Sequence, residues 1–158
     1  MMQGARRAFE NDGCLLPNLF LLSTGKELYS ITLSLPDTAE QKALEFNLIR
    51  LQLQARGLSV HEAVLFSETW FVNAQDVPAV TQLAPSQHPA RQEAIVAVGR
   101  SADNRRYSQV IQPFTRDKAS RPVWQPVLLA TYDEPRTAQD GPTGILDFLF
   151  DGVSATAR

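Results

Sequence analysis

Residues 27–36 read ELYSITLSLP, and their alternation decides the fold class. Tyr29, Ile31, Leu33 and Leu35 are apolar, whereas the residues between them are serines and a threonine. A period of two is typical of a β-strand that buries one face and leaves the other in water. The sequence therefore predicts a strand here, within a sheet that has one wet face.

A helix is predicted directly after this strand. Pro36 ends the strand, and Asp37 with Glu40 matches a capping box at the start of a helix. Apolar residues then recur at helical spacing as far as Gly57: Leu44, Leu48, Leu51 and Ala55, with Phe46, Ile49 and Leu53 widening the stripe. A stripe of that width predicts a helix that lies flat on the sheet.

The flanking segments predict further strands and two short helices. Residues 3–11 read as a helix closed by Gly13, and CLLPNLFLL (14–22) reads as an edge or bulged strand because it contains Pro17. Strands are also predicted in LSVHEAVLFSETWFV (58–72), EAIVAVG (93–99), YSQVIQPFT (107–115) and WQPVLLATY (124–132), and a terminal helix in GILDFLFDGV (144–153).

These elements predict an α+β fold in the order α-β-β-α-β-β-β-α, with WQPVLLATY (124–132) as a further strand. We expect an antiparallel sheet of about five strands with helices packed on one face. The 158 residues fit a single domain, 1–158, with frayed ends, a long loop at 74–90 and a linker at 133–143. A loop as long as 74–90 is often functional, and three prolines punctuate it.

Composition narrows the choice of partners and compartment. The formal net charge of −2 gives no nucleic-acid signal, and the basic residues of 100–121 divide between two loops, 101–106 and 116–121. No apolar run reaches the roughly 18 residues that span a bilayer, so we expect no membrane partner. A single cysteine, Cys14, cannot form an internal disulfide, which favours a reducing compartment, the cytoplasm. Because Cys14 stands beside leucines, we expect its thiol to be buried.

No cofactor or metal is predicted. His61 and Glu62 begin a metalloprotease motif, but Leu65 stands where the second histidine is required. Ser67 and Ser86 lack the glycine-flanked turn of a nucleophilic serine. The sequence therefore leans away from an enzyme without deciding the question.

One polar neighbourhood is a candidate binding pocket. Glu68 and Trp70 share one face of a predicted strand, and Arg91 and Glu93 share one face at the start of another. His88 lies in the proline-rich segment just before them. If the two strands are neighbours, these side chains form either an ion-paired cluster that fixes strand register or a polar pocket for a ligand or a reacting group.

The same segments resemble a group of small uncharacterised prokaryotic proteins. The shared motifs are an S-E-[AT]-W strand, here Ser67 to Trp70, followed by P-S-x-x-P-x-R-x-E, here Pro85 to Glu93. The similarity extends from the first helix to about Pro113. Thr69 replaces the usual small residue, and Gln87 and Ala90 replace acidic residues of the second segment. The resemblance implies a shared fold and no particular activity.

Three functional hypotheses follow. The first is a non-catalytic cytoplasmic module that meets a protein partner through the 74–90 loop or an exposed sheet edge. The second is a small-ligand binder or enzyme with its polar pocket at Glu68, Arg91 and Glu93, walled by Trp70. The third is self-association through the apolar CLLPNLFLL segment, because an unpaired strand edge favours pairing between chains.

Overall fold

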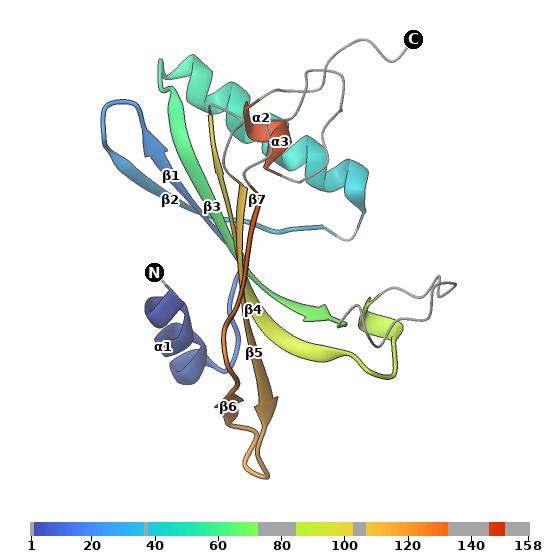
Figure 1. Ribbon diagram of the computed structural model, residues 1–158. Helices are drawn as coiled ribbons and strands as arrows, with labels where there is room; N and C mark the ends of the chain where they lie inside the picture. Colours follow the sequence, from blue (N-terminus) through green and yellow to red (C-terminus); the bar gives the residue numbers. More distant parts are fainter. Residues whose placement is uncertain (1, 37, 73–84, 103–106, 133–145, 151–158) are drawn as a thin grey trace. The chain divides into compact units, whose positions relative to one another are not determined.

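The computed structural model describes residues 2–36, 38–72, 85–102, 107–132 and 146–150 (Figure 1). Most of the predicted loop at 74–90 and the whole linker at 133–143 therefore lie outside the described residues. The elements are α1 (Met2–Asp12), β1 (Asn18–Ser23), β2 (Leu28–Thr32), α2 (Ala39–Ala55), β3 (Val60–Phe71), the 3₁₀ turn η2 (Pro85–Gln87), β4 (Gln92–Ser101), β5 (Tyr107–Arg116), β6 (Pro122–Trp124), β7 (Leu128–Tyr132) and α3 (Asp147–Phe150).

The strands form one open antiparallel sheet in an α+β fold, as predicted. The strand order is β2-β1-β3-β4-β5-β6, and β7 also pairs with β5. The sheet has seven strands rather than about five, so the order α-β-β-α-β-β-β-α was wrong after β5. The segment 124–132 divides between β6 and β7 because Pro126, which has no amide hydrogen to donate, interrupts it.

The chain packs as two compact units. The first comprises residues 1–16, 66–97 and 109–130, and the second comprises 17–65, 98–108 and 131–158. Strands β3, β4, β5 and β7 contribute residues to both. The assignment of 1–158 to a single domain stays a prediction, and each unit is described by itself.

The core of the second unit lies between α2, α3 and the strands β1 and β3. Helices α2 and α3 pack against each other. The buried members of this core are Leu19, Leu21, Leu33, Phe46, Ile49, Leu53, Ala63, Leu65, Leu146 and Leu149. The four residues of the predicted inward face, Tyr29, Ile31, Leu33 and Leu35, belong to this core or pack against it, which confirms the prediction, whereas Leu28 at the start of the segment is exposed.

Helix α2 differs from its predicted orientation. Its core face consists of Phe46, Ile49 and Leu53, whereas Leu44, Leu48 and Leu51 are 59%, 50% and 52% exposed. The expectation that this leucine row faces the sheet was wrong. Both rows have helical spacing, so the periodicity alone could not choose between them.

Two local contacts explain the position of α2. The helix begins after Thr38, whose hydroxyl accepts a hydrogen bond from the Gln41 amide at 3.2 Å, so Thr38 is the N-cap. The capping role predicted for Asp37 falls on a residue outside the described set. The Glu45 carboxylate accepts hydrogen bonds from the amides of Ser34 and Leu35, which fixes the rotation of the helix beside the end of β2.

Three predictions about the first strands were wrong. Strand β1 lies between β2 and β3, so CLLPNLFLL is not a sheet edge, and Pro17 precedes the strand instead of breaking it. Cys14 is exposed, because the chain is not yet in the strand there. Strand β2 ends at Thr32 rather than at Pro36, and Leu35 has a positive φ of 41°.

The first unit is built around an aromatic cluster. Phe9 of α1 packs against Phe114 of β5 and Trp124 of β6, with ring centroids 4.8 and 5.8 Å away. The Trp124 indole donates a hydrogen bond to Glu10 at 2.6 Å, which ties α1 to β6. Gly13 ends the helix with φ of 74°, and its amide donates to the Phe9 carbonyl, as the sequence predicted.

Candidate functional site

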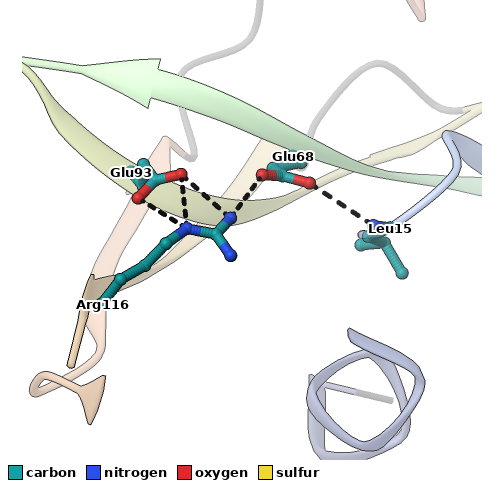
Figure 2. Close-up of polar contacts among 4 residues, drawn as sticks. All are labelled: Leu15, Glu68, Glu93 and Arg116. Atoms are coloured by element: carbon teal, nitrogen blue, oxygen red, sulfur yellow. Dashed lines mark hydrogen bonds and ion pairs between the residues drawn. The ribbon is translucent and has the colours of Figure 1, made fainter. Parts of the chain in front are cut away.

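Glu68 and Glu93 lie near each other in the first unit, where both bind one arginine, Arg116 (Figure 2). Arg116 Nε donates to both Glu93 oxygens at 3.1 Å, and Nη2 donates to Glu93 Oε1 at 3.0 Å. Nη2 also lies 3.5 Å from Glu68 Oε1. We call these three residues the Arg116 cluster.

Strand adjacency brings the three residues together. Glu68 is on β3, Glu93 is on β4 and Arg116 ends β5, and these strands are consecutive in the sheet. Arg116 lies two residues after Phe114 and therefore on the same face, which places its guanidinium 5.3 Å from the centre of the Phe9 ring. The cluster thus lies beside α1.

The second oxygen of Glu68 extends the cluster to the segment after α1. Glu68 Oε2 accepts a hydrogen bond from the Leu15 amide at 3.4 Å (Figure 2). Arg116 also stacks on Phe9 of α1. The cluster therefore links β3, β4 and β5 both to α1 and to the segment that follows it. The arrangement has the geometry of a structural brace, in which the oxygen atoms of both acids already have donors.

The other predicted site residues surround a second contact. Arg91 lies over the Trp70 ring, with its guanidinium carbon 5.0 Å from the ring centre. Trp70 is 40% exposed, so the pair is a surface cation–π contact. The sequence suggested that Arg91 would pair with one of the acids, but the arginine that binds both acids is Arg116.

His88 has a local structural contact. It is buried, and its Nδ1 accepts a hydrogen bond from the Ala90 amide at 3.1 Å. The Arg91 amide in turn donates to the His88 carbonyl. These two bonds hold the turn between η2 and β4. The first occupies Nδ1 of the His88 ring and the second its backbone carbonyl.

Two arginine–carboxylate pairs lie near the end of β5, Arg116 with Glu93 and Arg121 with Asp117, and each shifts a pKa. The hydrogen bonds to Glu93 raise the pKa of Arg116, which therefore stays charged throughout the working pH range. Just beyond it, the Arg121 amide and guanidinium lower the pKa of Asp117. Asp117 also accepts from the Ala119 amide, so its carboxylate closes the turn between β5 and β6.

The described part of the chain contains no group of three His, Cys, Asp or Glu side chains that could hold a metal ion. Among the same residues, no helix is long and apolar enough to cross a membrane. Two of the basic residues counted in 100–121, Arg116 and Arg121, form ion pairs with acids. Arg100 is buried, with its guanidinium over Phe150.

No protein-family model, curated protein or solved structure matches this chain. The resemblance to the prokaryotic group with the S-E-[AT]-W strand therefore stays a prediction.

Sequence reasoning missed Arg116, because it counted this residue among the basic loop residues. One signal could have identified it: Arg116 shares the parity of the buried Phe114, so it points to the covered face of β5 rather than to solvent.

Proposed function

We propose that this protein is a non-catalytic protein-interaction or adaptor module of the cytoplasm. The observation that supports this most is the exposed row of Leu44, Leu48 and Leu51 on α2. A single exposed leucine is ordinary, but a row of three on one helix is a typical binding surface. Cys14 is an exposed free thiol, which fits a reducing compartment.

The energy available from this surface is enough for a protein contact. Each leucine is about half exposed, so covering the three side chains contributes on the order of 3 kcal/mol. Strand β2 is at the edge of the sheet and adds unpaired backbone groups near the same helix. Leu44 and Leu48 line a groove of about 410 Å³ between α2 and the chain at the end of β2.

The alternative, a ligand or catalytic pocket at Glu68, Arg91 and Glu93, has less support. Arg116 donates to both carboxylates, and Arg91 stacks on Trp70. A ligand would have to displace Arg116 before either acid could bind or transfer a proton. We therefore favour the structural interpretation of these residues.

A photo-crosslinking experiment tests the proposed interaction surface. A benzophenone amino acid replaces Gln54, an exposed residue of α2 beside the leucine row, and a control protein carries it at Gln3, an exposed residue of α1. Irradiation in prokaryotic cells should link a polypeptide to position 54 and not to position 3. If neither position, or only position 3, yields an adduct, the proposed surface is wrong.

A further inference from the structure

We infer that the partner of the α2 leucine row is the α2 of a second copy of this chain, packed antiparallel across a two-fold axis. This inference rests on the proposed function, whose surface it assigns to a specific occupant. Three features of α2 support it: the spacing of the row, the shape of its side chains and the distribution of charge along the helix.

The row has the spacing of a coiled-coil seam. Leu44, Leu48, Leu51 and Ala55 are separated by four, three and four residues, which is the alternation of d and a positions in a heptad. The core face uses the other positions, Phe46, Ile49 and Leu53. Helix α2 therefore carries a complete second seam that the core of its own unit does not use.

The shape of the row is self-complementary. An antiparallel two-fold axis midway along the row places Leu48 of one copy against Leu51 of the other, and Leu44 against Ala55. The large Leu44 thus meets the small Ala55 at each end. This alternation allows the two helices to approach closely without overlapping side chains.

The residues that flank the seam do not oppose this contact. In heptad terms they are Asn47, Gln52 and Gln54, which carry no charge, and Glu45. Glu45 is bound to the amides of Ser34 and Leu35, so its carboxylate is directed toward its own chain. Like-charge repulsion at the seam is therefore limited to Arg50, whose guanidinium donates hydrogen bonds to Asn47 and Gln54 on one flank.

Charge along the helix selects the antiparallel direction. Residues 39–47 contain Glu40, Lys42 and Glu45, a net charge of −1, whereas residues 48–56 contain only Arg50 and Arg56, a net charge of +2. Glu45 keeps its negative charge and contributes to this difference over distance, although its oxygens are bound to amides of its own chain. Antiparallel packing places the acidic half of each helix opposite the basic half of the other. It also opposes the two helix dipoles, whereas a parallel pair would align them.

Sedimentation velocity over a range of concentrations tests the association. The wild-type chain should form a dimer, and the double variant Leu48→Gln/Leu51→Gln should dissociate about a hundredfold more readily. Leu129→Gln removes an exposed leucine of β7 and should leave the dimer unchanged. Circular dichroism of the dilute variants verifies that each remains folded.

Disulfide trapping tests the direction of packing. In a Cys14→Ser background, oxidation of a mixture of Leu44→Cys and Ala55→Cys chains should give the mixed 44–55 disulfide. Chains that carry Leu44→Cys alone should not cross-link, because the two copies of position 44 lie at opposite ends of the seam. A 44–44 disulfide would overturn the antiparallel arrangement.

The results separate this inference from the proposed function. A wild-type chain that stays monomeric, or a double variant that still dimerises, overturns the two-fold seam. If the chain is monomeric and position 54 nevertheless cross-links to a different polypeptide, the interaction function stands and only its occupant is wrong. If position 54 yields no adduct at all, both are overturned. A dimer that depends on Leu48 and Leu51 supports both.

Discussion

Replacing Arg116 with methionine should destabilise the protein by about 2 kcal/mol. Methionine keeps an apolar stem beside Phe9 but removes every hydrogen bond to the two acids. Glu93 receives three contacts at 3.0–3.1 Å from Arg116, but the side chains of the pair are 32% and 20% exposed. Screening at that exposure reduces the pair to about 1 kcal/mol.

The remaining contacts of Arg116 add smaller contributions. The Glu68 contact, at 3.5 Å, contributes about 0.5 kcal/mol. Stacking on Phe9 and Phe114, at 5.3 and 5.4 Å from the ring centres, adds about another 0.5 kcal/mol. The sum corresponds to a fall in Tm of roughly 4–8 °C for a chain of this size.

Urea denaturation measures the free energy of unfolding, with Arg121→Met as the matched control. Arg121 also has an ion pair, with Asp117 at 2.8 Å, but its side chain is 78% exposed, so its loss should cost clearly less stability than the loss of Arg116. Equal losses for the two variants would contradict the brace interpretation. Unchanged or raised stability in Arg116→Met would favour a functional pocket instead, because such sites often trade stability for activity.

Further predictions concern single residues of both units. Phe9→Ala should cost about 3–4 kcal/mol in the free energy of unfolding, because the buried ring packs on Phe114 and Trp124; a loss below about 1 kcal/mol would mean that α1 does not anchor the unit. Gly57→Ala should destabilise the protein by about 1 kcal/mol, because Gly57 has φ of 70°. Gly4→Ala should stabilise it by about 0.5–1 kcal/mol, because Gly4 lies inside α1 and an added Cβ meets open space. Thermal melting of both variants checks that the two effects have opposite signs. Asp117→Asn should lower Tm more at pH 7 than at pH 2. A carboxyl whose folded pKa lies below its ordinary 3.8 stabilises the fold above pH 3.8, and the contribution is lost as pH falls through the folded pKa. A Tm difference that stays constant from pH 7 to pH 2 would contradict this role.

The sequence predicts an element correctly where the apolar alternation or a turn residue is compatible with only one local structure. The strand at 28–32 and the helix that ends at Gly13 follow from period-two spacing and from a glycine with positive φ. The rotation of α2 could not be predicted, because both of its faces are apolar and the bonds from Glu45 to the chain after β2 are contacts between separate elements.

The candidate site shows the same limit. Glu68 and Glu93 lie near each other because β3 and β4 are neighbours, and Arg91 lies over Trp70. The partner that binds both acids lies on β5, 23 residues beyond Glu93. Only the sheet order brings Arg116 to them, and local sequence patterns carry no information about that order.

The division of α2 into a core face and a binding face is the central claim, and two matched leucines test it directly. The measurement is the free energy of unfolding of Leu53→Ala and Leu51→Ala at a protein concentration below the dimer range. Leu53 is 8% exposed and Leu51 52%, so the losses should be about 2–4 kcal/mol for Leu53→Ala and about 1 kcal/mol or less for Leu51→Ala. Equal losses, or a larger loss for Leu51→Ala, would contradict the account.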